Sequence, residues 1–275
     1  MSIGPCYNRA IPIFHHDWRQ QLSGAILQEV AHRPWSLPQA PWVMAQRWQD
    51  LLFAHWPLPP AALAALLPPA LELDTFDGQG WLGVVPFRMS GVRPRLLPAV
   101  PWLSAFPELN VRTYVRLRDR GVEKRGVYFF SLDAANPVAV AIARRTFWLP
   151  YFRAQMRLHD DGRTIHYASH RTHAGAAPAD LIAGYAPAGP VYRAKPGDLD
   201  HWLTERYSLY TVDGSGRPYI GEIHHVQWPL QPARAEFLVN TMAGAAAMRL
   251  PDLPPLLNFV RRLDVVVWPI RPVEP

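Results

Sequence analysis

The sequence predicts a mainly β protein of the α+β type: a single antiparallel β-barrel or folded sheet with a few short helices. Short apolar segments separated by tight turns recur through most of the 275 residues, which is typical of antiparallel sheets. The 30 prolines are scattered and exclude a long helical bundle, because proline breaks helix interiors. Hydrophobic residues at 49% against 18% charged residues supply a sizeable core, so the chain is globular.

One domain is expected over residues 32–275, preceded by a helical extension over residues 1–31. The extension has Asp17 as a candidate N-cap and apolar residues at four-residue spacing, namely Trp18, Leu22, Ile26 and Val30. No Gly/Ser-rich linker, charge block or fixed-period repeat divides the rest of the chain. A second domain is therefore not indicated.

The elements expected before residue 134 are mostly strands. Pro59-Pro60 suits a first helical turn, so a short helix is predicted over residues 61–67. Asp77-Gly78 is a strong turn signal and predicts a hairpin between residues 71–76 and 81–89. The other expected strands cover residues 42–56, 111–117 and 127–133, the last two paired with each other.

The second half is also expected to be strand-rich. Residues 138–146 mix small and β-branched side chains, which fits either a short helix or a crossover ended by Pro150. Asp160-Asp161-Gly162 predicts a turn between strands 151–158 and 164–171. The remaining expected elements are a helix over residues 199–204 and strands over 206–212, 219–228, 237–241 and 264–270.

Charge restricts the class of partner. The formal charge of +6 suits nucleic acid or an anionic membrane only where basic residues cluster. The densest basic stretch, residues 112–125, is interrupted by Asp119 and Glu123 and is interpreted as a solvated hairpin tip rather than a polyanion patch. The longest apolar run, residues 59–71, is too short to span a bilayer. We expect no nucleic-acid partner and no membrane partner.

Cysteine and histidine content limit metal and redox chemistry. Cys6 is the only cysteine, which excludes an intramolecular disulfide and a cysteine-based zinc site. The absence of disulfides and of a signal-peptide pattern predicts a cytoplasmic protein. His224-His225 resembles a metal pair, but adjacent strand residues point to opposite faces. We expect no metal and no cofactor.

A polar strand face provides the main candidate site. Alternate strand residues share a face, which groups Glu108, Asn110, Arg112 and Tyr114. This face either lines a cavity or meets solvent with an ordinary Glu108–Arg112 salt bridge. We expect the cavity, with Arg112 and Tyr114 pointing inward and Arg112 paired to Glu108 or Glu205, because an unpaired buried guanidinium costs several kcal/mol. Arg112→Ala is then expected to destabilise the fold by roughly 3 to 5 kcal/mol.

A second candidate lies at the helix-to-strand junction Glu205-Arg206-Tyr207. These side chains either reach a pocket mouth or form a structural ion pair. The 11 tryptophans either stack on an aromatic ligand or fill the core with large rings.

A series of local motifs occurs in order over residues 32–268. They are Arg33-Pro34-Trp35, Gln46 with Trp48, His55-Trp56-Pro57, Leu73-Asp74-Thr75-Phe76-Asp77-Gly78, Gly83-Val84-Val85-Pro86-Phe87, Glu108-Leu109-Asn110-Val111-Arg112-Thr113-Tyr114-Val115, Phe129-Phe130-Ser131-Leu132-Asp133-Ala134 and Trp202-Leu203-Thr204-Glu205-Arg206-Tyr207. The series resembles the bacterial DUF2071 family, also called YqjF-like, which has no settled biochemical role. That family resembles acetoacetate decarboxylase in fold, which implies an antiparallel sheet curled into a cone or barrel around an internal pocket.

The decarboxylase resemblance also bears on the chemistry. In the decarboxylase, Gly-Arg-Glu, four variable positions ending in Pro, and Lys-Lys supply the Schiff-base lysine and the neighbour that lowers its pKa. Residues 143–152 match this segment and keep Arg144 and Pro150, but Tyr151 and Phe152 replace the lysines. The resemblance therefore implies the pocket without Schiff-base chemistry.

Together these observations predict a cofactor-free protein that binds a small anionic or aromatic molecule in an internal pocket, with its oligomeric state left open. The predicted ligand-binding residues are Asn110, Arg112, Tyr114, Arg144, Tyr151, Arg206 and Tyr207. The alternative is an acid/base enzyme, a lyase or hydrolase acting on a small carboxylate or ketone, with Glu108 or Glu205 as acid/base and Arg112 as anion clamp. A raised carboxyl pKa in the pocket distinguishes the enzyme. A nucleic-acid-binding protein, the third hypothesis, predicts steep salt dependence of binding.

Overall fold

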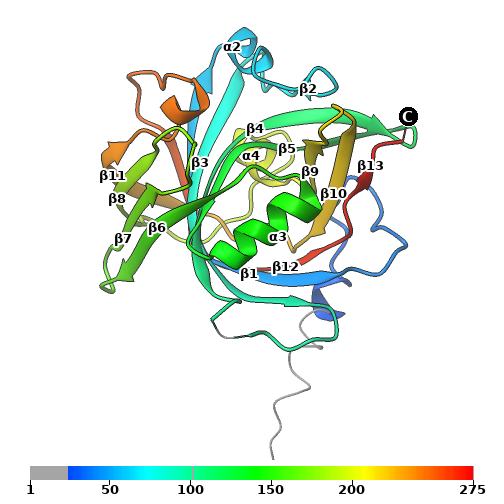
Figure 1. Cartoon of the computed structure of the whole chain (residues 1–275), viewed down its shortest axis with the longest axis horizontal. Helices are drawn as coiled ribbons and strands as arrows, with labels where there is room; N and C mark the ends of the chain where they lie inside the picture. The colour runs from blue at the N-terminus through cyan, green and yellow to red at the C-terminus, as the bar shows by residue number, and fades with distance from the viewer. Residues whose placement is uncertain (1–23, 101, 275) are drawn as a thin grey trace, which may run out of the picture.

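Strands dominate the computed structural model, which describes residues 24–100 and 102–274 (Figure 1). The strands are β1 Met44–Leu58, β2 Glu72–Leu73, β3 Gly80–Pro94, β4 Phe106–Asp119, β5 Val122–Ala134, β6 Tyr151–Asp160, β7 Ile165–Arg171, β8 Asp180–Pro187, β9 Ser208–Val212, β10 Pro218–His224, β11 Gln231–Asn240, β12 Leu256–Val267 and β13 Arg271–Pro272. The helices are α2 Pro60–Ala64, α3 Pro137–Phe147, α4 Leu199–Thr204 and the 3-10 turn η1 Gly244–Ala246. The predicted mainly β class is confirmed. Most of the predicted extension over residues 1–31 lies outside the described residues, and only residues 24–26 of the remainder are helical.

The strand pairings form a closed path. Each strand of the path pairs with the next in the order β4, β3, β1, β12, β10, β9 and β5. The path closes because β5 also pairs with β4. β6, β7, β8 and β11 form a branch that leaves this path at β5 and returns to it at β12 (Figure 1). All the strands named above thus belong to one sheet.

The expectation of a wholly antiparallel sheet is wrong at β5, which runs parallel to β6 and to β9. Parallel neighbours need a crossover connection, and α3 supplies it between β5 and β6. Residues 138–146 are therefore both a helix and part of a crossover. The side chain of Asn136 begins α3 by accepting hydrogen bonds from the backbone N–H groups of Val138 and Ala139 at 3.0 Å each.

The predicted hairpin across Asp77-Gly78 is wrong in its strands. The turn itself forms, with both residues at positive φ, but β2 pairs with β4 rather than with β3. The reason lies at Asp74, whose backbone N–H donates to the carbonyl of Tyr114 at 2.9 Å and holds this segment along β4. Strands β8 and β13 were not expected from the sequence.

Both faces of β4 are buried over residues 108–115. Leu109 and Val111 pack in a hydrophobic cluster with Tyr167 and Tyr185 of the branch. The polar face of β4 therefore does not meet solvent. It lies opposite to the face of Leu109 and Val111, on the side of β4 away from the branch. Within the described part of the chain, no helix combines the length and apolar character needed to cross a membrane.

Candidate functional site

A cavity of about 480 Å³ lies within the closed strand path, and each of the seven strands of that path contributes lining residues. The inner face of α3 covers it with Ala139, Ala143 and Phe147. The volume falls in the range of roughly 300 to 1,000 Å³ that is usual for small-molecule sites. Of the predicted site residues, five line the cavity: Glu108, Asn110, Arg112, Tyr151 and Arg206.

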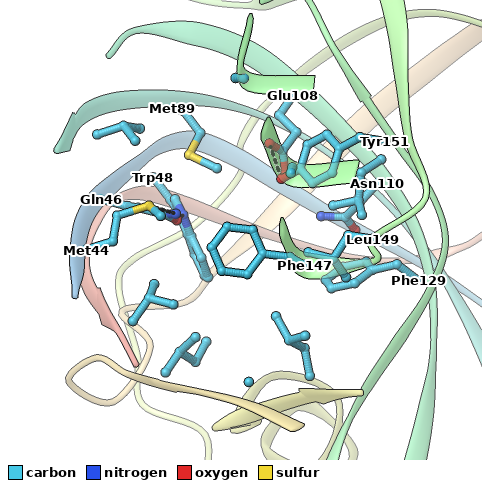
Figure 2. A pocket seen from close by; sticks show the side chains of 18 of the residues that line it. Met44, Gln46, Trp48, Met89, Glu108, Asn110, Phe129, Phe147, Leu149 and Tyr151 are labelled. Carbon is cyan, nitrogen blue, oxygen red and sulfur yellow. Dashed lines mark hydrogen bonds between the residues drawn. The ribbon is translucent and has the colours of Figure 1, made fainter. Parts of the chain in front are cut away.

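Glu108 is the only acidic residue among the described residues that line the cavity. Tyr151, the first residue of β6, donates its hydroxyl to Oε2 of Glu108 at 3.0 Å (Figure 2). Burial raises the pKa of Glu108 to about 8, and the charge of Asp133 adds to this effect, whereas the hydrogen bond from Tyr151 opposes it. The carboxyl group therefore keeps its proton near neutral pH.

Arg112 lines the cavity with its side chain 9% exposed. Its guanidinium carbon lies 5.0 Å from the ring centroid of Phe53 and 5.9 Å from that of Tyr114. Its Nε has no hydrogen-bond partner, and the ion pairs of the described residues do not include it. The cation faces the cavity against aromatic rings.

The predicted pairing of Arg112 with Glu108 or Glu205 is therefore wrong. Glu108 lies four positions away on the same strand, roughly 13 Å along a regular strand, with Asn110 between the two. Asn110 is itself buried, and its Oδ1 has no hydrogen-bond partner. Glu108, Asn110 and Arg112 follow one another along this face as a neutral acid, an amide and a cation, and no ion pair or hydrogen bond among the described residues joins these three to one another.

Tyr114 does not line the cavity, contrary to expectation. It is fully buried, and its hydroxyl is hydrogen-bonded to Nε2 of His55 at 2.6 Å. Burial lowers the pKa of His55 well below its ordinary value, and the nearby Arg112 lowers it further, so the imidazole is neutral. Tyr114 and His55 support Arg112 from behind the cavity wall.

Glu205 and Tyr207 also lie outside the cavity lining. Tyr207 donates its hydroxyl to Oε2 of Glu205, and the backbone N–H of Trp228 donates to Oε1 at 3.0 Å. Both carboxylate oxygens thus serve local structure. Burial, followed by the charge of Glu205, raises the pKa of Tyr207.

The two remaining predicted arginines differ in position. Arg206 lines the cavity, with Nη1 donating to Asp74 at 2.7 Å and Nε to the Trp202 carbonyl at 2.7 Å, while Nη2 has no partner. Arg144 is absent from the lining, and its Nη1 donates to the backbone carbonyl of Tyr151 at 2.8 Å. The expected Glu205–Arg206 ion pair is replaced by Asp74–Arg206.

The sequence reasoning missed the contribution of α3 to the cavity. Ala139, Ala143 and Phe147 recur at four-residue spacing, which places them on one helix face. The sequence left residues 138–146 as either a helix or a crossover, and neither interpretation gave a reason to expect a cavity beside them. The hydroxyl-bearing Thr204 and Ser208, which also line the cavity, had no distinguishing sequence signal.

Metal and lysine chemistry have few candidate groups in the described residues. These residues contain no cluster of three or more histidine, cysteine or acidic side chains able to hold a metal ion. Neither lysine lines the cavity. Lys124 forms ion pairs with Asp119 at 3.0 Å and Glu222 at 3.2 Å, and Lys195 is exposed. Tyr151 lines the cavity at one of the two positions that match the decarboxylase lysines, and Phe152 does not.

Comparison with known proteins gives one family and one fold. The family profile of DUF2071, described as an uncharacterized conserved protein, matches residues 45–264. The uncharacterized protein YqjF of Bacillus subtilis (strain 168) is 45% identical over 236 residues, covering 86% of this chain and 95% of that protein.

The similar solved structures share the fold at low sequence identity. Acetoacetate decarboxylase from Legionella pneumophila subsp. pneumophila str. Philadelphia 1 has a TM-score of 0.55 at 16% identity, covering 91% of this chain and 95% of its own. The enduracididine biosynthesis enzyme MppR complexed with pyruvate has a TM-score of 0.55 at 10% identity, covering 88% and 93%. The fold is therefore acetoacetate decarboxylase-like.

Proposed function

This chain belongs to the DUF2071 family, and from that premise we propose that it binds a small organic carboxylate in the cavity lined by Arg112. The observation that carries the proposal is a buried guanidinium that faces a cavity without a carboxylate partner among the described residues. A buried arginine keeps its proton, and an anion offsets the cost of burying that charge. A ligand carboxylate offers that charge with matching bidentate geometry.

The ligand class has support from a structural neighbour. The enzyme MppR, which has the same fold, is complexed with pyruvate, a small carboxylate. We infer also that the closed strand path is the cone-shaped barrel implied by the resemblance, with the cavity inside it. The proposed binding needs no cofactor.

A thermal-shift titration with small carboxylates, ketones and aromatic acids tests this proposal. A carboxylate at about 100 times its Kd stabilises the fold by about 2.7 kcal/mol, so we expect the Tm of the wild-type protein to rise. Arg112→Gln removes the charge and should abolish the rise. Arg144→Gln, an arginine outside the cavity lining, is the matched control and should keep it. A carboxylate response that persists in Arg112→Gln contradicts the proposal.

A second candidate function, an acid/base enzyme of the lyase or hydrolase type, is favoured by the raised pKa of Glu108. A carboxyl group that holds its proton near neutral pH can serve as a general acid toward a ligand that extends from Arg112 along β4 to Glu108. Tyr151, at 3.0 Å, is placed to orient it. Glu108→Gln should then abolish turnover of a carboxylate substrate while the carboxylate-induced rise in Tm remains. If turnover survives in this variant, Glu108 is not the acid.

Schiff-base chemistry is not part of either candidate function, because neither lysine lines the cavity. We expect that treatment with pyruvate and borohydride leaves the intact mass unchanged. A reduced adduct on Lys124 or Lys195 would overturn this expectation.

A further inference from the structure

We propose that the cavity selects a monocarboxylate with an apolar tail of several carbons rather than a compact acid. This inference rests on the proposed carboxylate site at Arg112 and adds the chemistry of the rest of the ligand. It is carried by the way that polar and apolar side chains separate along the cavity.

One end of the cavity, called here the head end, is defined by Asn110, Arg112 and Arg206. Three buried polar atoms there have no hydrogen-bond partner: Nε of Arg112, Oδ1 of Asn110 and Nη2 of Arg206. Buried polar atoms are normally paired. The head end therefore fits the charged or polar part of a ligand.

The opposite end, called here the tail end, is defined by Met44, Met89, Val92, Leu103 and Val267. Its polar neighbours pair with one another: Nε1 of Trp48 donates to Oε1 of Gln46 at 2.9 Å, and Nε2 of Gln46 donates to the sulfur of Met44 at 3.2 Å. Figure 2 shows Met44, Gln46, Trp48 and Met89 grouped across the cavity from Asn110 and Tyr151.

Methionine side chains are flexible and polarizable, so they pack against apolar groups of varied shape. Two of them at the tail end provide an adaptable wall for an alkyl or aryl group. Arg93 also lines this end, with its guanidinium carbon 6.0 Å from the ring centroid of Trp42. Arg93→Gln is included in the experiment because Arg93 is a cation at the opposite end of the cavity from Arg112.

The register of β3 and β4 shows how far apart the two ends lie. Arg112 is opposite Gly83, and Phe106 is opposite Met89. The two rows are six residues apart, roughly 20 Å along the strands. A compact acid held at Arg112 leaves the tail end empty.

The test is a binding series of straight-chain acids, from acetate through butanoate, hexanoate and octanoate to decanoate, measured by calorimetry below the micelle concentration. If the tail is buried, affinity rises about fourfold per methylene until the tail end is filled. Octanol and octylamine, which lack the carboxylate, should bind far more weakly than octanoate. A series in which acetate and octanoate bind equally well, both dependent on Arg112, overturns this inference and leaves the proposed function intact. Absence of binding at every length overturns both.

Variants at the two ends localise the ligand. Met89→Trp fills the tail end and should weaken octanoate at least tenfold without changing acetate binding, and Met44→Trp provides the same test at a second position. Arg112→Gln should weaken every acid, by a larger factor than Arg93→Gln. If Arg93→Gln has the larger effect, the carboxylate sits at the tail end and the inference is overturned. Octanoate affinity that stays unchanged in both tryptophan variants also overturns the inference.

Discussion

Three buried arginines, Arg171, Arg206 and Arg112, have contrasting surroundings in this protein. Arg171 of β7 donates to both carboxylate oxygens of Asp133 in β5 at 2.7 Å each, and Arg206 donates to Asp74 at 2.7 Å. Arg112 faces Phe53 and the cavity instead and has no ion pair within the described residues. The comparison separates charges that hold the fold together from a charge that is available to a ligand.

Two buried carboxyl groups, Asp133 and Glu108, differ in the same way, because one is paired with an arginine and the other is not. Asp133 is held by Arg171, whereas Glu108 meets only the hydroxyl of Tyr151 and lowers the cost of burial by keeping its proton. Arginine lacks that route, because its pKa is too high for it to become neutral. Of these two groups on β4, only Arg112 keeps its charge near neutral pH, and the proposed carboxylate is assigned to it.

Breaking a paired arginine should give the largest loss of stability. Arg171→Ala leaves Asp133 buried without its partner, so we expect the free energy of unfolding to fall by about 3 to 5 kcal/mol, measured by urea denaturation. Arg262→Ala is the control, because Arg262 pairs with Asp264 at 2.8 Å while 46% exposed, and it should cost less than about 1 kcal/mol. Equal losses in the two variants would erase the distinction between the buried and the exposed pair.

The second-largest effect is expected in the pH dependence of stability and comes from the unpaired carboxyl group of Glu108. The pKa of Glu108 is raised from 4.5 to about 8. The stability that its neutral form contributes is thus fully present below about pH 4.5 and is lost as the pH rises through about 8. The slope is at most about 1.4 kcal/mol per pH unit.

Glu108→Gln removes this titration and keeps the size of the side chain. Urea denaturation of both proteins between about pH 5 and pH 9 should show wild-type stability falling relative to the variant as the pH increases. Parallel curves would mean that Glu108 ionises normally in the folded protein.

Removing the unpaired arginine should change stability least. Arg112→Met leaves no carboxylate partner behind, so we expect the free energy of unfolding to change by less than about 1 kcal/mol, in contrast to the several kcal/mol lost when a buried pair is broken. The loss of roughly 3 to 5 kcal/mol expected from the sequence required a buried partner. Urea denaturation without added ligand measures the change. A loss as large as that of Arg171→Ala would show that Arg112 serves the fold as Arg171 does.

The sequence predicted those parts of the fold that local pattern determines. The turn at Asp160-Asp161-Gly162 joins β6 and β7 as expected, and α4 spans the predicted residues 199–204. The Gly- and Ala-containing β8 lacks a clear run of β-forming residues, and it is held by its neighbours β7 and β11. The parallel pairing of β5 depends on contacts remote in sequence, which no local pattern reports.

The candidate site shows the same limit. Alternation along β4 correctly grouped Glu108, Asn110 and Arg112 on the cavity side, because a strand period is local. The partner of each charge is not local: Arg206 binds Asp74 from 132 residues away. Tyr151 reaches Glu108 only because the crossover places it beside Leu132 in the parallel pair.

The position of α3 has a consequence for how proteins of this fold can diverge. The helix contributes Ala139 and Ala143 to the cavity wall but stands outside the strand ladder. Larger side chains at these two positions would reduce the cavity without removing any hydrogen bond between strands, whereas changes in β4 would alter the group that binds the anion. For the proposed ligand, size and head-group chemistry are therefore expected to depend on separate segments of the chain, so that substitutions could change one without the other.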